Sequence, residues 1–294
     1  MPNPIILSGK TVSTAVYEEL QPRINKLKAK GIVPGLGVIL VGDDPASQVY
    51  VNSKARRFNK LDLFSETIIL PSDITENELV EKINILNADA NFHGILIQSP
   101  LPKHLDYNKI LLNVDHAKDV DGFHPVNVGK LTLGTPQFIP CTPKGVMRIL
   151  EHYNLEIYGK QVVVIGRSNI VGRPLSILTS LKQKYSNATT TICHSGTTDI
   201  PAIAKQADVL IAAIGVPEMV DESYIKEGAV VIDVGINRVE DNSEKGYKLV
   251  GDVNFDSVQN VASAITPVPG GVGPMTIAML VENTIEAAEL SLSF

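Results

Sequence analysis

Tyr50, Lys54 and Gln98 are side chains whose types and spacing could do chemistry in this 294-residue sequence. Tyr50 and Lys54 lie four residues apart in a predicted helix, 45–61, so they share one face of that helix. Gln98 closes an otherwise apolar predicted strand, 92–98. A lysine becomes a general base where burial lowers its pKa, and these three groups could converge on a cleft. The alternative, an ordinary solvated helix face carrying Tyr50 and Lys54, stays open at this point.

The stretch Tyr50-Val51-Asn52-Ser53-Lys54 also matches the Tyr-x-x-x-Lys pair of short-chain dehydrogenases. In that family the pair lies far downstream of an amino-terminal glycine motif. Here it precedes the glycine-bearing turn by more than a hundred residues. The order of the motifs therefore argues against that family.

The glycine-bearing turn is the first sign of a cofactor. A predicted strand, 161–166, runs through Gly166 into a helix from about Pro174, the context in which backbone N–H groups reach a pyrophosphate. The spacing departs from G-x-G-x-x-G, because Ser168 stands where the second glycine would be and Gly172 falls one position late. The turn alone is equally compatible with a protein that binds no dinucleotide. Its βαβ surroundings favour nicotinamide binding and a redox enzyme.

The next predicted strand indicates which nicotinamide cofactor binds. It ends Cys193-His194-Ser195-Gly196, without the Asp or Glu that an NAD site would use for the ribose hydroxyls. Arg167 and Ser195 could instead bind a 2′-phosphate, through a charge-assisted and a neutral hydrogen bond. We therefore predict NADP, with a merely solvated Arg167 as the alternative.

The elements that must position these side chains alternate between strands and helices. Asp44 can cap a helix that has Pro45 at its first position, and Thr75 with Glu78 forms a capping box. The strands are continuous apolar runs, as in a parallel sheet covered by helices on both faces. In this half we predict strands over 35–41, 64–70 and 92–98 and helices over 45–61 and 76–87.

The same alternation restarts after a connection at 115–141 that shows little periodicity. A helix opens at Thr142 and Pro143, and a Rossmann-type pattern follows. It consists of strands over 161–166, 189–193, 208–215, 229–235 and 247–251, helices from about 174 and over 200–206, a polar loop at 240–245, and a last helix over 275–289. We predict a two-domain α/β protein with a substrate domain at 1–139, a dinucleotide-binding domain at 140–274, and the helix at 275–294 packing on the first domain.

Composition and charge argue against other classes of partner. A net charge of −6 and a pI near 5.6 disfavour binding to nucleic acid, and no apolar run is long enough to span a membrane. Cys141 and Cys193 are too few for a disulfide framework, so we expect free thiols and a cytoplasmic location. The six histidines lack paired metal spacing, and the acidic loop 119–122 lacks the Glu of an EF-hand. We predict no metal, and this loop could be a simple turn.

Seven motifs occur in order along nearly the whole chain: YVNSK, IQSPLP, KDVDGFHP, PCTPKG, VVIGRSNIVGRP, DVGINR and PVPGGVGPMT. In these motifs the chain resembles the bifunctional methylenetetrahydrofolate dehydrogenase/methenyltetrahydrofolate cyclohydrolase family. One departure is visible, Ser99 after Gln98, where the family often has an apolar residue.

The resemblance implies a folate-binding catalytic domain, a Rossmann-type NADP domain, a cleft between them and a homodimer. It implies NADP-dependent oxidation of 5,10-methylenetetrahydrofolate to the 5,10-methenyl compound, and hydrolysis of that product to 10-formyltetrahydrofolate. These reactions belong to one-carbon metabolism, which supplies purine and amino-acid biosynthesis. Other NADP-dependent two-domain dehydrogenases, acting on shikimate or an amino acid, and a non-catalytic dinucleotide sensor are the alternatives.

The resemblance also assigns roles to single residues. Lys54 is then the catalytic lysine that activates water, Gln98 hydrogen-bonds Lys54, Tyr50 lines the pterin site and Asp121 anchors the pterin ring. A lysine can activate water only when neutral, which burial and a neighbouring cation both favour. The folate-binding set also includes Pro269, Gly270 and Gly271, and the cofactor-binding set is Gly166, Arg167, Ser168, Ser195 and Ile236.

Overall fold

The computed structural model describes residues 3–242 and 246–293, and the chain divides into two compact units. We name each unit after its main sheet. Two long helices, α1 (Gly9–Lys28) and α10 (Val272–Leu290), each contribute residues to both units. The three-stranded unit comprises residues 16–141 and 277–293, and the six-stranded unit comprises residues 3–15 and 142–276.

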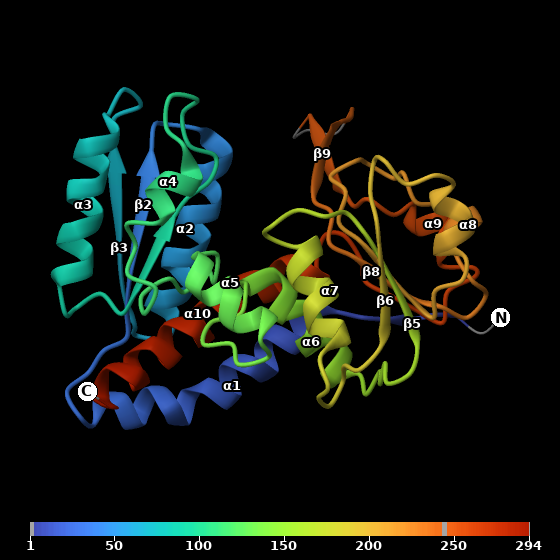
Figure 1. The fold of residues 1–294 in the computed structure, drawn as a ribbon, viewed down its shortest axis with the longest axis horizontal. Coiled ribbons are helices and arrows are strands. Elements are labelled where there is room, and N and C mark those ends of the chain that lie inside the picture. The colour runs from blue at the N-terminus through green and yellow to red at the C-terminus, as the bar shows by residue number, and fades with distance from the viewer. Residues whose placement is uncertain (1–2, 243–245, 294) are drawn as a thin grey trace. The chain divides into compact units, whose positions relative to one another are not determined.

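The three-stranded sheet is parallel and is built around a buried central strand. β2 (Gly35–Val41) is buried along its whole length, between β3 (Phe64–Leu70) and β4 (Gly94–Ile97). Helices α2 (Pro45–Lys60) and α3 (Glu76–Ala88) lie on opposite sides of this sheet (Figure 1). Apolar side chains are therefore needed on both faces of β2, which explains its unbroken apolar run. The unit also contains α4 (Tyr107–Leu111), α5 (Pro125–Thr132) and the 3₁₀ turn η2 (Ser291–Ser293).

Both helices that cover this sheet begin where the sequence predicts. The Asp44 carboxylate accepts the Ser47 N–H at 2.8 Å, and Pro45 takes the first position of α2. At α3 the Thr75 hydroxyl accepts the Glu78 N–H while the Glu78 carboxylate accepts the Thr75 N–H, which completes the capping box. Local side-chain chemistry thus fixes the start of the helix that carries Lys54.

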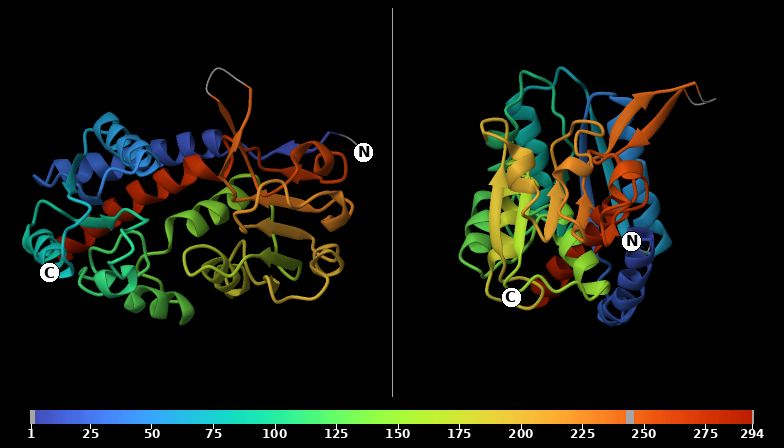
Figure 2. Two further views of the ribbon diagram at one scale, coloured as in Figure 1. Left: turned by 90° about the horizontal axis from the view of Figure 1, so that it is seen from above. Right: turned by 90° about the vertical axis from the view of Figure 1, so that its right-hand side faces the viewer.

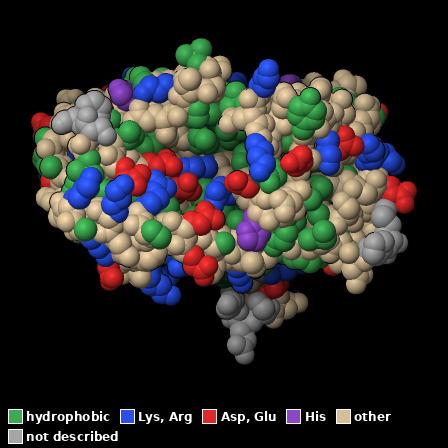
Figure 3. Space-filling model, turned by 90° about the horizontal axis from the view of Figure 1, so that it is seen from below, with side chains coloured by type: hydrophobic (Ala, Val, Ile, Leu, Met, Phe, Trp, Pro, Cys, Tyr) green, Lys and Arg blue, Asp and Glu red, His purple; other side chains and the backbone are tan. Residues whose placement is uncertain are grey.

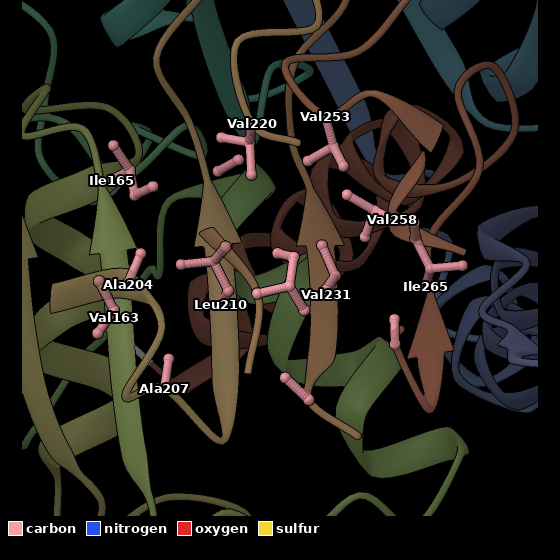
Figure 4. Close-up of a cluster of buried hydrophobic side chains, with 14 of the residues drawn as sticks. Val163, Ile165, Ala204, Ala207, Leu210, Val220, Val231, Val253, Val258 and Ile265 are labelled. Atoms are coloured by element: carbon pink, nitrogen blue, oxygen red, sulfur yellow. The ribbon is translucent and has the colours of Figure 1, made fainter. Parts of the chain in front are cut away.

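The six-stranded sheet is also parallel, with the order β1-β11-β8-β7-β5-β6. Its middle strands contribute to a buried cluster on one face that includes Val163, Leu210, Val231 and Ile265 (Figure 4). Its strands are β1 (Ile5–Ile6), β5 (Gln161–Ile165), β6 (Thr189–Cys193), β7 (Val209–Ala212), β8 (Val230–Asp233) and β11 (Ala264–Ile265). Its other elements are α6 (Cys141–His152), α7 (Gly172–Ser180), α8 (Ile200–Ala204), η1 (Glu222–Tyr224) and α9 (Phe255–Val258).

An antiparallel hairpin extends from this sheet (Figure 2). It pairs β9 (Asn237–Glu240) with β10 (Tyr247–Val250), and the Arg238 guanidinium lies 3.9 Å from the centre of the Tyr247 ring. We predicted the strand at 247–251 but not its partner. The residues 243–245 of the predicted polar loop lie outside the described residues.

The two-domain α/β class is confirmed, but the structure differs from the sequence prediction in detail. The predicted division assigns residues 1–139 to one domain, whereas residues 3–15 cluster with the six-stranded unit because β1 pairs with β11. β1 and β11 are only two residues long and show no periodicity, so the sequence did not predict either strand. The featureless connection at 115–141 contains α5, and the last helix begins at Val272 rather than at residue 275.

The surface mixes charges of both signs. Lysine and arginine side chains alternate with aspartate and glutamate over the face shown in Figure 3. This distribution agrees with the small net charge of −6. Among the described helices, none is both long and apolar enough to cross a membrane.

Candidate active site

Lys54 lies on α2 and is 9% exposed. Its Nζ donates a 3.0 Å hydrogen bond to Oε1 of Gln98, the residue directly after β4. The Gln98 side-chain amide donates to the Ser99 carbonyl oxygen at 2.8 Å, which orients the Gln98 oxygen toward Lys54. Lys54 therefore does not lie on a solvated helix face, and its hydrogen-bond partner is an uncharged amide.

The surroundings of Lys54 favour its neutral form. Burial lowers the pKa of Lys54, and the Asp121 carboxylate and Cys141 act in the opposite direction without cancelling this effect. The amide oxygen of Gln98 can accept a hydrogen bond from either form of the amine. Lys54 is thus placed as a nitrogen that can give up and take up a proton below the usual pH range of a lysine.

Asp121 interacts with Lys54 from the loop between α4 and α5. Burial raises the pKa of Asp121, whereas the Lys54 ammonium and a hydrogen bond with the Cys141 side chain lower it. Burial also raises the pKa of Tyr107, and the charge of Asp121 contributes to that shift. The structure therefore brings Lys54, Gln98 and Asp121 together.

The position of Asp121 is fixed by residues that the sequence did not single out. Asn283, on α10, is fully buried, and its Nδ2 donates to the carbonyl oxygens of Val120 at 2.8 Å and Ile139 at 3.0 Å. Gly122 has a φ of +75°, and a Cβ there would lie 2.8 Å from the Pro140 nitrogen. Only glycine fits this backbone beside Asp121. These contacts join residues that are far apart in the sequence, so no local sequence pattern predicts them.

Asp119 has a structural task in the same loop. It is 1% exposed, and its Oδ2 accepts the His124 N–H and the Asn127 side-chain N–H, both at 2.8 Å. Burial raises the pKa of Asp119 to about 7, against the lowering effect of these hydrogen bonds. Of the two carboxylates in the acidic loop, Asp119 shapes the turn and Asp121 faces the lysine.

Tyr50 lies one turn before Lys54 on α2 and is 47% exposed. Tyr50 is thus about half accessible, whereas Lys54 is buried. The exposed Ser99 adjoins Gln98 at the end of β4. Tyr50 and Ser99 therefore provide accessible surface next to Lys54 and Gln98.

In the six-stranded unit, both glycines of the turn are required by close backbone contacts. Gly166 has a φ of +120°, and a Cβ there would overlap the Ala213 carbonyl oxygen. A Cβ at Gly172 would overlap the carbonyl oxygen of Gly166, so the late glycine lets α7 pack on the strand end. The Ser168 hydroxyl accepts the N–H groups of Val171 at 3.2 Å and Gly172 at 3.4 Å. Ser168 thereby stabilises the start of α7.

Arg167 and Ser195 follow neighbouring strands. Ile165 of β5 is paired in register with Cys193 of β6. Arg167 lies two residues after Ile165, and Ser195 lies two residues after Cys193. Both side chains are exposed at the carboxyl edge of the sheet. A cation and a hydroxyl group at this edge fit the 2′-phosphate of NADP.

Ile236 and the segment 269–271 complete the predicted set. Ile236 follows β8 and is 42% exposed, and its Cδ1 would lie 3.1 Å from a Cβ at Gly273. Gly270 has a φ of +108°, and its carbonyl oxygen accepts the Lys10 N–H at 3.2 Å. A Cβ at Gly271 would lie 2.5 Å from the Pro267 carbonyl oxygen. This loop is therefore tightly constrained by its own backbone.

A hollow of about 1160 Å³ opens elsewhere in the three-stranded unit. Its lining includes Phe92 and His93, which precede β4. Gln98 follows the opposite, carboxyl end of the same strand, so this hollow is separate from the lysine site. Ligands of parallel sheets bind at carboxyl ends, which favours the lysine site as the centre of chemistry. In the described part of the chain, no group of three or more His, Cys, Asp or Glu side chains is arranged to bind a metal ion.

The strand order and the glycine turn place the protein among two-unit α/β proteins with a Rossmann-type nucleotide-binding unit. Residues 7–121 match the catalytic-domain model of tetrahydrofolate dehydrogenase/cyclohydrolase, and residues 140–292 match the model of its NAD(P)-binding domain. The chain belongs to the tetrahydrofolate dehydrogenase/cyclohydrolase family. The resemblance carried by the seven motifs is confirmed.

Individual relatives agree over nearly the full length. The bifunctional protein FolD of Prosthecochloris aestuarii is 53% identical over 287 residues, which cover 96% of this chain and 97% of the relative. The crystal structure of FolD from Campylobacter jejuni has a TM-score of 0.92 at 48% identity, covering 97% of this chain and 99% of that one. The Trypanosoma brucei FolD structure, complexed with NADP and an inhibitor, has a TM-score of 0.94 at 38% identity and covers both chains fully.

The alternative of a shikimate-type dehydrogenase has weaker support. Shikimate dehydrogenase of Aquifex aeolicus has a TM-score of 0.50 at 14% identity, covering 89% of this chain and 98% of that one. At this identity the likeness shows the fold alone. The alternative is therefore not favoured.

Proposed function

We propose that this protein oxidises 5,10-methylenetetrahydrofolate to 5,10-methenyltetrahydrofolate with NADP and hydrolyses that product to 10-formyltetrahydrofolate. The family membership supports both activities. The structural observation that carries the proposal is the buried Lys54 amine, hydrogen-bonded to the neutral Gln98 amide. A non-catalytic dinucleotide sensor would have no need of a lysine whose pKa is lowered by burial.

In this proposal the pterin ring binds in the three-stranded unit. The Asp121 carboxylate accepts hydrogen bonds from its amino and ring N–H groups, and the exposed Tyr50 ring packs against it. Pro269, Gly270 and Gly271 also contact the folate. Because Asp121 is held by its loop, binding the pterin costs little ordering of the protein, and orientation can supply much of the rate.

The cofactor residues are Gly166, Arg167, Ser168, Ser195 and Ile236. The Gly166 backbone allows close approach of the pyrophosphate, and Arg167 and Ser195 bind the 2′-phosphate. NADP held by these residues would supply the hydride acceptor for the methylene bridge carbon of the folate. No strong acid or base is needed for that step, because the adjacent folate nitrogen stabilises the resulting cation.

The hydrolysis is assigned to Lys54. A water oxygen bonds to the bridge carbon, and the neutral Nζ accepts the proton that the water loses. The bond from the bridge carbon to N5 then breaks. N5 takes the electron pair and gains a proton as the new hydroxyl group loses its own, which leaves a formyl group on N10 and an N–H at N5. Gln98 keeps Nζ oriented through both protonation states, since its oxygen accepts from either one.

The test uses purified protein with methylenetetrahydrofolate and NADP, following the methenyl and formyl products by absorbance. Lys54→Met should abolish hydrolysis of supplied methenyltetrahydrofolate while sparing part of the hydride transfer. Lys60→Met removes an exposed lysine from the same helix and should leave both rates unchanged. Intact hydrolysis in Lys54→Met would refute the role of Lys54, and a wild-type protein that turns over neither folate would refute the function.

We further propose that the protein forms a homodimer in the cytoplasm. The hairpin β9–β10 supports the dimer, because two strands alone are marginally stable and its described outer edges pair with no third strand. Cys141 and Cys193 are both buried and are not joined in a disulfide, which fits a reducing compartment. Light scattering should give about twice the chain mass of 31.7 kDa, and the single-chain mass at micromolar concentration would contradict the dimer.

A further inference from the structure

Asp233 and Asp252 are two buried carboxylates of the six-stranded unit that the proposed mechanism does not use. Asp233 is the last residue of β8 and is 3% exposed, and Asp252 follows β10 and is fully buried. Burial raises the pKa of Asp233 to about 7, while backbone N–H donors lower it and the nearby Asp252 raises it further. In the described part of the chain, no salt bridge joins either carboxylate to a basic side chain. Such burial is costly unless hydrogen bonds compensate for it.

Asp233 joins the loop after β8 to the segment after β10. Its Oδ1 accepts the N–H groups of Gly235 at 2.9 Å and Asp252 at 3.0 Å, and its Oδ2 accepts the Val253 N–H at 3.0 Å. The Asp233 N–H donates to the Thr266 hydroxyl at 2.7 Å. A single side chain thus fixes the backbone at both ends of the β9–β10 hairpin.

Asp252 joins the loop after β7 to the same hairpin. Its Oδ2 accepts the N–H groups of Ile214 at 2.6 Å and Gly215 at 2.9 Å. Its Oδ1 accepts the side-chain N–H of Asn237, the first residue of β9, at 2.8 Å. The loops that leave two neighbouring strands, β7 and β8, are therefore tied to one pair of carboxylates.

The backbone around the pair leaves room for nothing larger than glycine. A Cβ at Gly251 would overlap the carboxylate of Asp233, and a Cβ at Gly235 would overlap the carboxylate of Asp252. Each carboxylate thus lies directly against a glycine in the segment that carries the other one. The two carboxylates and the two glycines therefore form one tightly packed arrangement at the carboxyl edge of the sheet.

Asp233 and Asp252 lie on the side of the glycine turn where the nicotinamide half of a dinucleotide binds, whereas Arg167 and Ser195 lie on the adenosine side. A dinucleotide crosses the carboxyl edge of such a sheet with its pyrophosphate at the glycine turn, which here follows β5. Ser195 follows β6, so the adenosine 2′-phosphate lies on the β6 side of the turn. β7 and β8 lie on the other side of β5, so the nicotinamide half meets the loops at 213–215 and 234–236.

We propose that Asp233 and Asp252 are positioning residues for the nicotinamide half of NADP. They hold the Ile214–Gly215 backbone and the Ile236 segment where hydride transfer requires them. Ile236 is bracketed by the pair, because Gly235 donates to Asp233 and Asn237 donates to Asp252. The inference rests on the proposed function, since it assigns the pair to the oxidation and not to the hydrolysis.

The decisive variant is Asp233→Asn, which keeps the shape of the side chain. Its oxygen can replace one carboxylate oxygen, but its NH2 group then faces a backbone N–H donor. We expect kcat/KM for NADP to fall about ten- to a hundredfold, the effect of losing hydrogen bonds to a charged group. Hydrolysis of supplied methenyltetrahydrofolate, assayed without NADP, should keep its rate. Asp221→Asn, which removes a partly exposed carboxylate of the same unit that caps η1, should change neither.

A second readout separates positioning from general loss of structure. Adenosine 2′,5′-bisphosphate represents the adenosine half alone, so its inhibition constant should stay at the wild-type value in Asp233→Asn. If this constant weakens together with kcat/KM, or if neither changes, the inference is overturned. Should Asp233→Asn fail to fold, Asn237→Ala removes the half-buried contact of Asp252 and is judged by the same two readouts. Comparing NADP with the bisphosphate by binding needs no turnover, so the inference can fail or stand apart from the proposed function.

Discussion

Gln98→Glu tests whether hydrolysis depends on a neutral Lys54. The substitution keeps the shape of the side chain but places a carboxylate where the amide oxygen now lies 3.0 Å from Nζ. The carboxylate charge is shared by two oxygens, so its centre lies roughly 4 Å from the amine, and at an effective dielectric constant of about 20 the attraction is about 4 kcal/mol. That energy corresponds to a rise of about 3 units in the pKa of Lys54.

The expected result is a large, pH-dependent loss of hydrolysis. A rise of about 3 pKa units reduces the neutral fraction of Lys54 about a thousandfold at pH values below its pKa, and the rate should fall in proportion. Because deprotonation recovers as pH rises, the variant should regain activity at alkaline pH. Hydride transfer needs no base and should fall much less.

The assay is the loss of methenyltetrahydrofolate absorbance at a series of pH values, without NADP. Asn52→Asp adds the same charge at an exposed position of α2 and should behave like the wild type. Wild-type hydrolysis by Gln98→Glu near neutral pH, or a loss that does not diminish with rising pH, would refute the reasoning.

Three further substitutions test other parts of the structure. Arg167→Ala should raise KM for NADP about ten- to a hundredfold and leave KM for NAD unchanged, whereas equal effects in steady-state assays would exclude a phosphate role. Gly172→Ala forces a methyl group into the Gly166 carbonyl oxygen and should lower stability by about 1–3 kcal/mol or more, so an unchanged thermal midpoint would contradict the packing. Asp119 has a pKa of about 7 when folded, against an ordinary value of 3.8, so the folded state binds more protons and loses stability as pH rises between these values. The free energy of unfolding of the wild type, measured with urea, should therefore fall by up to about 4 kcal/mol relative to that of Asp119→Asn between pH 4 and pH 7. Parallel curves of stability against pH for the two proteins would refute this.

Local chemistry made the framework of the lysine site predictable. β2 and β4 are apolar because helices cover both faces of their sheet, and the caps of α2 and α3 lie within three residues of the groups they bind. Gln98 stands out as the polar end of a buried strand. Asp233 ends β8 in the same way. This polar strand end is a sequence signal that could have drawn attention to Asp233 and its neighbour Asp252.

What the sequence could not resolve depends on distant contacts. Asp119 and Asp121 are two positions apart in one acidic loop. The resemblance selects Asp121, but the local pattern alone does not show which of the two meets Lys54. Asn283 holds the Val120 carbonyl group across 163 residues of chain, so no spacing rule connects them. The short strands and α5 were missed because their stability comes from tertiary pairing and not from periodicity.

The coupled charges of Lys54 and Asp121 imply an order for the two reactions. Each group stabilises the charged form of the other, so in the proposed complex a pterin that donates N–H bonds to Asp121 favours the carboxylate, which raises the pKa of Lys54. Oxidation of the bridge carbon adds a positive charge to the folate, which acts on Lys54 in the opposite direction. If that charge forms nearer to Nζ than the Asp121 carboxylate lies, the inverse dependence of the energy on distance favours release of the lysine proton. The base required for hydrolysis would then arise only after its substrate exists, and the pKa of Lys54 should be higher in a complex with methylenetetrahydrofolate than with the methenyl compound.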